Sequence, residues 1–375
     1  MKKLLSFLLC AVIIVSFPIG ASAAQKPDVA AEAFVLYCPD NGQIVLSKDE
    51  NKKMRPASTT KLMTTLLTLE AAEQDDQTVT FTQDMVAEGS SMYLKLGEKV
   101  LLSDLAAGMM MASGNDAANA AALTLADSAE AFSKLMNERA SQLKMENTHF
   151  VTPSGLDDDN HYSTAYDMAL LMSAALTNSA FQKLTSQKSV TVNFTEPKDK
   201  VVTYSNHNRL LSMYEYCVGG KTGYTMAAGR CLVSAAKKDG LTLICVTLND
   251  KNDWNDHIKL YEYGFETLAA YTSPDSSFCV DIPCVGGTEE TTAVVGDSDV
   301  LLVVDKPDID KIKRTIYLDN FLYAPVSENQ KVGEIIYTLD GKVLKSVSLE
   351  AVSEIKVQSV KKSLWEKIKE WFTYG

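Results

Sequence analysis

The chain has 375 residues, of which 46% are hydrophobic, and its formal net charge at pH 7 is −12. That length and apolar content are sufficient for a large core and for two or more domains. The acidic balance argues against nucleic acid as a partner, because no extended basic surface is left to neutralise phosphates.

The beginning of the chain differs in composition from the rest. A lysine pair precedes an apolar run from Leu4 to about Phe17, and small residues follow at 21–23. This pattern predicts a secretory signal peptide over residues 1–23. A retained membrane anchor is the weaker interpretation, because the apolar run is short for a membrane span and ends at Pro18. We therefore expect an exported protein.

Strand and helix patterns alternate in the next part of the chain. Two β-rich runs flank Asp40-Asn41-Gly42 and predict a hairpin. Capping residues or apolar periodicity then predict five helices. They are Ser58–Ala72, the apolar segments that follow Ser103-Asp104 and Asn115-Asp116, residues 129–144, and the apolar segment that follows Ser163-Thr164. After about Ser189 strands return, and a helix containing Trp254 closes the region near Ala270. This order predicts an α+β fold over residues 24–271, with a helical subdomain inserted into an antiparallel sheet built from both ends of the region.

A second, smaller domain is expected further along the chain. TSPDSS at Thr272–Ser277 has the composition of a linker. Residues 278–357 are strand-like, with Asp340-Gly341 as a hairpin turn, and predict a small all-β domain. Six cysteines remain after the signal peptide, and an exported chain can form disulfides. Because several of them lie in strand-like runs, buried thiols are favoured, and any pairing stays open.

The tail, residues 359–375, predicts an amphipathic helix. Its apolar residues fall on one helical stripe, with lysines around the rest; the stripe is Leu364, Trp365, Ile368, Trp371 and Phe372. Two tryptophans on an apolar stripe with a basic rim are typical of a helix that lies in a membrane interface. The alternative is a helix docked on the protein's own core, and the charges exclude a spanning helix.

Ser58 and Lys61 are three residues apart at the start of a predicted helix, so they share one face of it. A serine hydroxyl is a poor nucleophile until a base takes its proton. A lysine can be that base only when burial or a neighbouring cation lowers its pKa. The S-x-x-K pattern alone is a weak signal, because a chain of this size contains several by chance.

Two further motifs accompany it, Ser113-Gly114-Asn115 at a helix–helix junction and Lys221-Thr222-Gly223 on a strand. S-x-x-K, S-D-N and K-T-G together form the motif set of serine β-lactamases and penicillin-binding proteins, and here the middle motif is S-G-N. The segments PASTTKLMT, ASGNDAANAAAL, THFVTPSGLDDDNHYSTAYDMALL and GGKTGYTMAAGRCLV closely resemble the low-molecular-mass penicillin-binding proteins, the D-alanyl-D-alanine carboxypeptidases of the peptidase S11 type. The resemblance is strong over residues 30–270 and looser over the later β-domain and the tail.

The resemblance implies a serine β-lactamase/transpeptidase-like fold and an acyl-enzyme mechanism. Ser58 would attack the bond between the two terminal D-alanines of a peptidoglycan stem peptide, with Lys61 as its general base. Ser113 would relay a proton to the leaving D-alanine. β-Lactam antibiotics would be covalent inhibitors, and the protein would act on the outer face of the cytoplasmic membrane, held there by its tail.

The same resemblance assigns substrate-binding roles. Asn115 would bind the substrate's amide backbone, and Lys221 with Thr222 would hold its terminal carboxylate. Gly223 would let the substrate lie close to the strand. The backbone N–H groups of Ser58 and Tyr224 would form the oxyanion hole. Thr225 and Arg209 are weaker candidates for further carboxylate contacts.

Three alternatives remain open. A D,D-endopeptidase would use the same residues. A class A-like β-lactamase would need a Glu-x-x-Leu-Asn stretch, which does not occur between Asn115 and Lys221, and would lack the second domain. A non-catalytic cell-wall binding protein would need neither Lys61 nor Ser113. The four histidines show no metal-ligand spacing, so neither a zinc carboxypeptidase nor any cofactor is expected.

Overall fold

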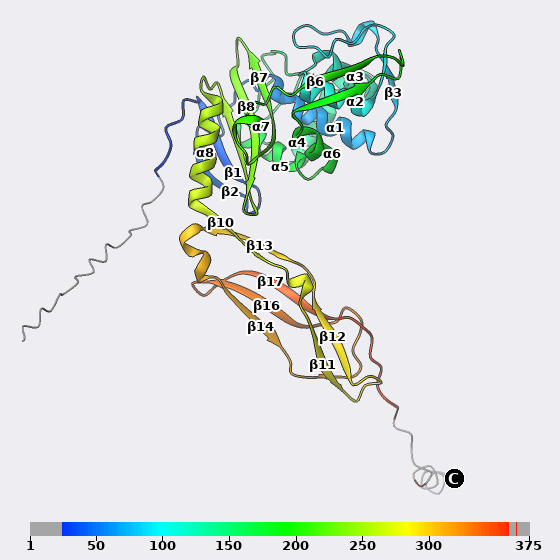
Figure 1. The fold of residues 1–375 in the computed structure, drawn as a ribbon, viewed down its shortest axis with the longest axis vertical. Helices are drawn as coiled ribbons and strands as arrows, with labels where there is room; N and C mark the ends of the chain where they lie inside the picture. Colours follow the sequence, from blue (N-terminus) through cyan, green and yellow to red (C-terminus); the bar gives the residue numbers. More distant parts are fainter. Residues whose placement is uncertain (1–24, 360–364, 366–375) are drawn as a thin grey trace, which may run out of the picture.

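Figure 1 shows the computed structural model, which describes residues 25–359 together with Trp365. A body of helices and sheet (here the N-terminal domain) is followed by an elongated body of strands (the β-domain). The predicted signal peptide, and the predicted tail helix apart from Ser359 and Trp365, lie outside the described residues. None of the helices in the described part of the chain combines the length and apolar character needed to cross a bilayer.

A five-stranded antiparallel sheet forms the centre of the N-terminal domain, in the order β2-β1-β9-β8-β7. Its strands are β1 (Ala33–Cys38), β2 (Gln43–Lys48), β7 (Cys217–Thr225), β8 (Gly229–Lys238) and β9 (Leu241–Leu248). β1 pairs with β9, so the sheet joins both ends of the domain, as predicted. All of β1 is buried, because helices cover both faces. Val35 packs in the cluster of the helical subdomain, whereas Leu36 packs with Leu260 and Phe265 of α8 (Asp253–Thr267).

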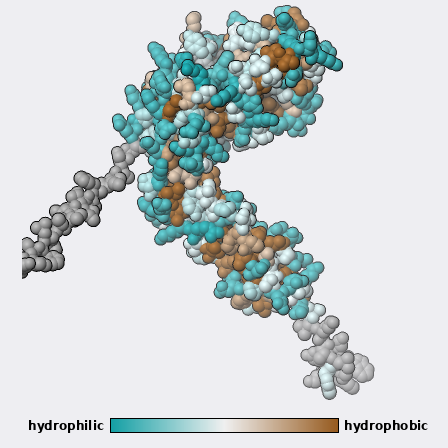
Figure 2. Space-filling view, viewed as in Figure 1, coloured by the Kyte–Doolittle hydropathy of each residue, from teal (hydrophilic) through white to brown (hydrophobic). Residues whose placement is uncertain are grey.

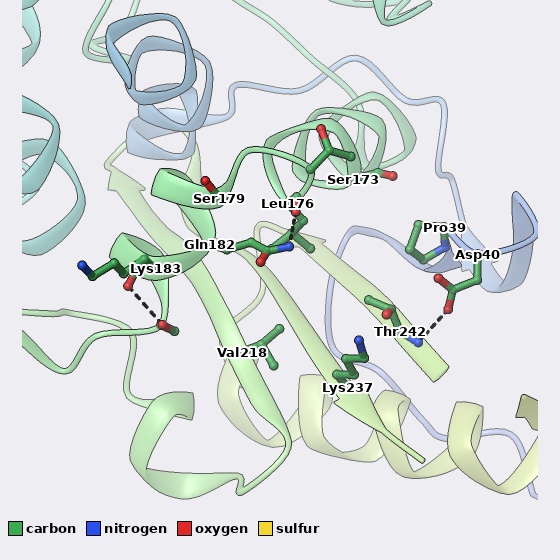
Figure 3. A pocket seen from close by; sticks show the side chains of 12 residues that line it. Pro39, Asp40, Ser173, Leu176, Ser179, Gln182, Lys183, Val218, Lys237 and Thr242 are labelled. Atoms are coloured by element: carbon green, nitrogen blue, oxygen red, sulfur yellow. Dashed lines mark hydrogen bonds between the residues drawn. The ribbon is translucent and has the colours of Figure 1, made fainter. Parts of the chain in front are cut away.

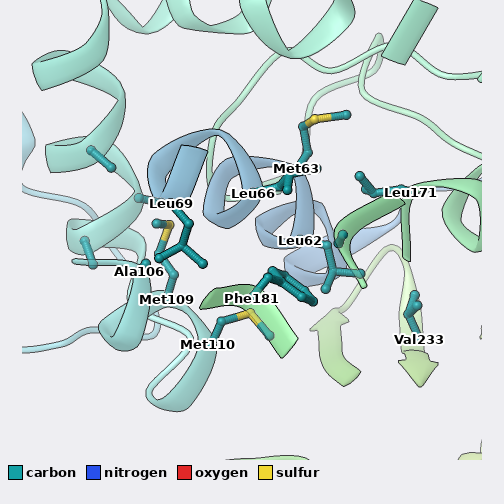
Figure 4. Packing of buried hydrophobic residues seen from close by; sticks show 14 of the residues in the cluster. Leu62, Met63, Leu66, Leu69, Ala106, Met109, Met110, Leu171, Phe181 and Val233 are labelled. Atoms are coloured by element: carbon teal, nitrogen blue, oxygen red, sulfur yellow. The ribbon is translucent and has the colours of Figure 1, made fainter. Parts of the chain in front are cut away.

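The helical subdomain is inserted between β2 and β7. Its elements are η1 (Ala57–Thr60), α1 (Lys61–Ala72), β3 (Thr78–Thr80), η2 (Gln83–Met85), β4 (Lys99–Leu101), α2 (Leu102–Met111), α3 (Asn115–Leu125), α4 (Ala129–Gln142), α5 (Ala165–Ala175), α6 (Ser179–Thr185), β5 (Ser189–Asn193), β6 (Val201–Ser205) and α7 (Leu210–Met213). α1 is enclosed by its neighbours, and Figure 4 shows its leucines against methionines of α2 and Phe181 of α6. The expectation of one helix from Ser58 was wrong in detail, because the α-helix begins at Lys61 and Ser58 lies on the preceding 3₁₀ turn.

The predicted helix caps are only partly confirmed. Thr164 caps α5, and its hydroxyl accepts a hydrogen bond from Asp167 N at 3.0 Å. At the other two predicted positions the N-cap residues are Leu101 and Gly114, and neither makes a side-chain capping bond. The Asn115 side chain instead accepts a hydrogen bond from Lys61, so it does not cap the helix.

The β-domain contains a six-stranded sheet, ordered β14-β16-β17-β12-β11-β15, and the pair β10-β13. Its elements are β10 (Leu268–Ser273), η3 (Asp275–Ser277), β11 (Cys279–Val285), β12 (Thr291–Gly296), β13 (Val300–Asp305), η4 (Lys306–Lys311), β14 (Lys313–Leu318), β15 (Leu322–Tyr323), β16 (Lys331–Leu339) and β17 (Lys342–Ala351). β16 and β17 form the hairpin predicted around Asp340-Gly341. The prediction of a linker at Thr272–Ser277 was wrong. Thr272 pairs with Leu301, and Asp275 is buried where it accepts hydrogen bonds from Arg314 and Tyr337.

The six cysteines of the described residues are free thiols. Four of them are buried, namely Cys38, Cys231, Cys245 and Cys284. This agrees with the interpretation favoured from their strand-like surroundings.

Candidate active site

The three sequence motifs meet at one cavity of about 300 Å³ in the N-terminal domain. η1 contributes Ser58, the junction of α2 and α3 contributes Ser113, and the edge strand β7 contributes Thr222, Gly223 and Tyr224. The other lining residues are Ser90, His207, Arg230, Cys231, Asp253 and Trp254. Segments far apart in the chain therefore place a hydroxyl, a second hydroxyl and a strand edge around one space.

Two glycines fit closely against the turn that carries Ser58. A Cβ on Gly155 would lie 1.9 Å from the carbonyl oxygen of Ala57, and a Cβ on Gly223 would lie 3.0 Å from Ser58 N. Ala57 itself has a φ of +50°, in the left-handed region that non-glycine residues rarely adopt. The surrounding structure thus holds η1 in a strained conformation that presents Ser58 to the cavity.

Lys61 is fully enclosed and makes three contacts. Its Nζ lies 3.0 Å from Ser58 Oγ, 2.7 Å from Asn115 Oδ1 and 2.7 Å from the carbonyl oxygen of Ser154. Burial, and then the positive charge of Lys221, hold the pKa of the Lys61 amine well below its usual range, while Asp116 acts in the opposite direction. An amine in this position is strongly favoured to lose its proton.

Lys221 is the second buried amine, and it contacts the middle motif. Its Nζ donates to Ser113 Oγ at 2.9 Å and to the carbonyl oxygen of Thr222 at 2.8 Å. Burial lowers the pKa of the Lys221 amine to about 7. Ser113 has a φ of +57°, so its hydroxyl is also presented by a left-handed residue.

Asn115 holds the Lys61 amine and the neighbouring loop together. Its Nδ2 donates to the carbonyl oxygen of Glu88 at 2.6 Å, while its Oδ1 accepts from Lys61. The next residue, Asp116, accepts from the backbone N–H groups of Met92 and Leu94. Both the Oδ1 and the Nδ2 of Asn115 have hydrogen-bond partners within the protein. The resemblance implies that Asn115 also binds a substrate amide, and this requires one of these two atoms to make a second hydrogen bond.

Two of the weaker candidates lie outside the cavity lining. The Thr225 hydroxyl donates to Asp157 Oδ1 at 3.0 Å and accepts from Ala228 N at 3.0 Å. Arg209 is exposed at the start of α7. Neither residue lines the cavity that contains Ser58.

Sequence reasoning missed an arginine that does line the cavity. Arg230 on β8 pairs across the sheet with Tyr224, and its guanidinium binds both carboxylate oxygens of Asp253 at 2.7 and 2.8 Å. Asp253 begins α8 and is buried. Arg230 lies opposite Tyr224, next to the K-T-G motif, and this position would have identified it as a site residue. The sequence alone does not reveal that β7 pairs with β8.

The segment that supplies the Ser154 carbonyl was also missed. His161 holds this segment in place. Its Nδ1 accepts from Val151 N at 3.0 Å, and its Nε2 lies 2.9 Å from Thr60 Oγ1. Burial lowers the pKa of His161 to about 4, so the ring is neutral at pH 7. This neutral histidine connects the 151–155 segment to η1.

A larger groove of about 620 Å³ lies elsewhere on the domain, between α5, α6 and the sheet (Figure 3). Its rim carries Asp40, Lys183 and Lys237, and none of the predicted site residues lines it. Within the described residues, no group of three or more His, Cys, Asp or Glu side chains is arranged to hold a metal ion. The motif cavity is therefore the candidate active site, although it is the smaller of the two.

Comparisons with known proteins agree with this geometry. The family described as D-alanyl-D-alanine carboxypeptidase (peptidase S11) matches residues 20–252, and the penicillin-binding protein 5 C-terminal domain matches residues 265–357. D-alanyl-D-alanine carboxypeptidase DacF of Bacillus subtilis is 31% identical over 374 residues, which cover 95% of this chain and 95% of that protein. DacC of Escherichia coli is 31% identical over 375 residues, with 93% and 91% covered.

Solved structures show the same fold. Penicillin-binding protein 5 from Haemophilus influenzae superposes with a TM-score of 0.68 at 28% identity, covering 88% of this chain and 99% of that one. A mutant of the Streptomyces K15 DD-transpeptidase has a TM-score of 0.61 at 30% identity and covers 64% of this chain and 99% of that one. The predicted fold class is confirmed. The chain belongs to the peptidase S11 family of D-alanyl-D-alanine carboxypeptidases, the penicillin-binding proteins that its motifs resemble.

Proposed function

We propose that this protein is a serine-type carboxypeptidase that removes the terminal D-alanine from peptidoglycan pentapeptide stems through an acyl-enzyme on Ser58. The observation that carries the proposal is the 3.0 Å contact between Ser58 Oγ, which lines the cavity, and the fully buried amine of Lys61. A nucleophile within hydrogen-bond reach of a base with a lowered pKa is the arrangement that acyl transfer requires.

The contacts of Lys61 fix the direction of its lone pair. Two of its three partners, the oxygens of Asn115 and Ser154, are carbonyl groups and can only accept hydrogen bonds. A neutral amine therefore gives its two N–H groups to these oxygens and turns its lone pair to the third partner, the Ser58 hydroxyl. In this arrangement Lys61 is the general base for Ser58.

The reaction then proceeds by acyl transfer. Ser58 Oγ attacks the carbonyl carbon between the two D-alanines while Lys61 takes the hydroxyl proton. The oxyanion accepts hydrogen bonds from the backbone N–H groups of Ser58 and Tyr224, and one such donor typically contributes about 3–4 kcal/mol. The C–N bond breaks, and Ser113 gives its hydroxyl proton to the leaving amine and takes one from the Lys61 ammonium, which becomes a neutral amine again. Water then hydrolyses the ester, with Lys61 again as base.

The carboxylate end of the substrate lies along β7 in this proposal. Lys221 and Thr222 hold the terminal carboxylate, and the negative charge favours the protonated form of the Lys221 amine, whose pKa is about 7 without it. A penicillin presents a carboxylate and a reactive amide in the same relation, which accounts for covalent inhibition. An endopeptidase acting on cross-links remains the second candidate, because it would use the same residues.

The test compares the wild type with Ser58→Ala. We expect the wild type to release D-alanine from a peptide ending in D-Ala-D-Ala and to be labelled covalently by a fluorescent penicillin. The variant should do neither, because it has no hydroxyl to acylate. Labelling of the variant would show that the nucleophile is another residue. Rapid turnover of the penicillin by the wild type would favour the β-lactamase, and faster release from a purified cross-linked dimer would favour the endopeptidase.

A glycine pair offers a test of the turn that carries Ser58. Gly155 and Gly97 have φ values of +79° and +80°, but a Cβ on Gly97 meets nothing within 4 Å. Gly97→Ala should cost only the backbone strain, about 1 kcal/mol. Gly155→Ala should also displace η1 and slow penicillin acylation about 100-fold, since small misplacements of reacting groups have effects of that size. Acylation rates and thermal unfolding of both variants measure this, and equal acylation rates would contradict it.

The location of the protein rests on its tail. The sequence predicts a basic amphipathic helix over residues 359–375, and we propose that it holds the exported enzyme on the outer face of the cytoplasmic membrane, where its substrate is accessible. Deletion of Leu364–Gly375 should release the protein from membranes and leave D-alanine release from a soluble peptide nearly unchanged. Fractionation of the two forms measures this, and equal recovery in the membrane fraction would rule out the tail as anchor.

A further inference from the structure

We propose that the far end of the β-domain is itself a membrane-contacting surface, formed by Val285, Phe321, Tyr323 and Val357 (here the tip patch). Their exposed fractions are 51%, 46%, 70% and 58%. Exposed apolar side chains are ordinary when scattered, but a cluster of them marks an interaction surface. The inference rests on the proposed membrane attachment and adds a second contact to it.

The members of the tip patch are neighbours in the fold. Val285 at the end of β11 pairs with Tyr323 of β15, and the rings of Phe321 and Tyr323 meet edge to face at 5.3 Å. Between them in sequence, Leu322 is buried, so strand alternation directs the two aromatic rings outward. Val357 lies beside the same turn, because it bridges to Gly287.

The chain leaves the β-domain at this point. Gln358 N donates to the carbonyl oxygen of Gly286 at 2.8 Å, one residue from Val285. Figure 1 shows the β11–β12 turn and the last described residues together at the end of the β-domain that is remote from the N-terminal domain. Figure 2 shows apolar surface over the part of the β-domain that lies toward this end.

The position of the tail then fixes what the tip patch faces. Leu364, the first residue of the tail's apolar stripe, follows Gln358 by six positions, a span of at most about 20 Å even when fully extended. A tail lying in the membrane interface therefore brings the tip patch to the lipid surface. Tyrosine and phenylalanine at such a surface bury apolar area while the tyrosine hydroxyl stays among the headgroups.

Charge separates this contact from that of the tail. Exposed acidic residues lie close in sequence to Val285 and Val357, namely Glu289, Glu290 and Glu354, and Lys356 is paired with Glu354. The tip patch is therefore not attracted to anionic lipid, and its contribution should depend little on salt or on lipid charge. The tail carries Lys361, Lys362, Lys367 and Lys369, and its contribution should depend on both.

The experiment uses the full mature chain and a matched pair of variants. Val285→Ser/Tyr323→Ser changes the tip patch. Val343→Ser/Tyr317→Ser changes a valine and a tyrosine that are both 56% exposed elsewhere on the β-domain, with Tyr317 on the opposite edge strand β14. Partitioning is measured by flotation with vesicles of phosphatidylcholine alone and with added phosphatidylglycerol, at low and high salt. Thermal unfolding and D-alanine release confirm that both variants are folded and active.

We expect the tip variant to partition about tenfold more weakly than wild type on both vesicles at either salt concentration, and the control variant to stay within about twofold. Partitioning of the tip variant equal to wild type overturns the inference.

Two other outcomes would overturn it as well. Tighter partitioning of the tip variant would show that the tip patch binds the tail and keeps it off the membrane. Unchanged partitioning with loss of a dimer would show that the tip patch is a contact between two copies of the chain. A third protein without Leu364–Gly375 separates the proposals. If this protein partitions as wild type, the proposed tail anchor is wrong. If it loses membrane binding while the tip variant does not, the tail anchor is supported and the proposed contact of the tip patch is wrong.

Discussion

Lys61→Met is expected to slow penicillin acylation of Ser58 by about 10³-fold while leaving the fold intact. The loss follows from removing the general base, whose contribution is typically 10²–10⁴-fold. Methionine fills a similar volume without a charge, and Lys61 is fully buried, so the substitution removes an amine whose protonated form is destabilised by its surroundings. Stopped-flow acylation with a chromogenic or fluorescent β-lactam measures the rate. An unchanged rate would show that another group takes the Ser58 proton.

The same variant should change how stability depends on pH. The pKa of Lys61 is lowered in the folded state, so between the folded and unfolded pKa values the unfolded chain binds more protons. The free energy of unfolding of the wild type therefore rises with pH in this window, by at most about 1.4 kcal/mol per pH unit for one lysine. Urea unfolding at pH 7 and pH 8.5 should show a smaller rise for Lys61→Met. Lys134→Met, at a lysine whose side chain is 70% exposed, should behave as wild type.

Asn115→Asp is the second change with a large expected effect. It places a carboxylate where Asn115 Oδ1 lies 2.7 Å from the Lys61 amine. An opposite charge at that distance raises the pKa of the amine, so Lys61 becomes a stable ammonium and has no lone pair for Ser58. We expect acylation at pH 7 to fall by about 10²–10³-fold.

A pH profile distinguishes this cause from simple loosening of the loop. Asn115→Ala also loses the contact with the Glu88 carbonyl but adds no charge. Acylation by Asn115→Asp should recover as the pH is raised, because the ammonium then deprotonates, whereas the slower rate of Asn115→Ala should not. Parallel profiles for the two variants would contradict the proposed role of charge at this position.

The sequence was sufficient to find the three motifs and the α+β fold, because these depend on side-chain identity and hydrophobic pattern. It was insufficient to predict the features of the site that depend on backbone atoms and backbone angles. The third partner of Lys61 is the carbonyl oxygen of Ser154, a group that every residue possesses. The strained φ angles of Ala57 and Ser113 likewise cannot be predicted from residue type, because neither alanine nor serine is typical of positive φ. Such features are fixed by packing against distant segments and appear only in the folded chain.

The errors at helix starts and at the domain junction have a common physical cause. Asn115 and Asp275 are polar residues in sequence contexts that favour a cap and a linker. Each is instead buried and hydrogen-bonded to a partner far along the chain, Asn115 to Lys61 and Asp275 to Arg314 and Tyr337. Local propensity could not anticipate partners that the tertiary fold supplies.

The complete enclosure of Lys61 keeps its amine out of reach of dissolved acids and bases. Dissolved buffers or small amines should therefore neither accelerate acylation nor restore activity to a protein in which the Lys61 side chain has been removed.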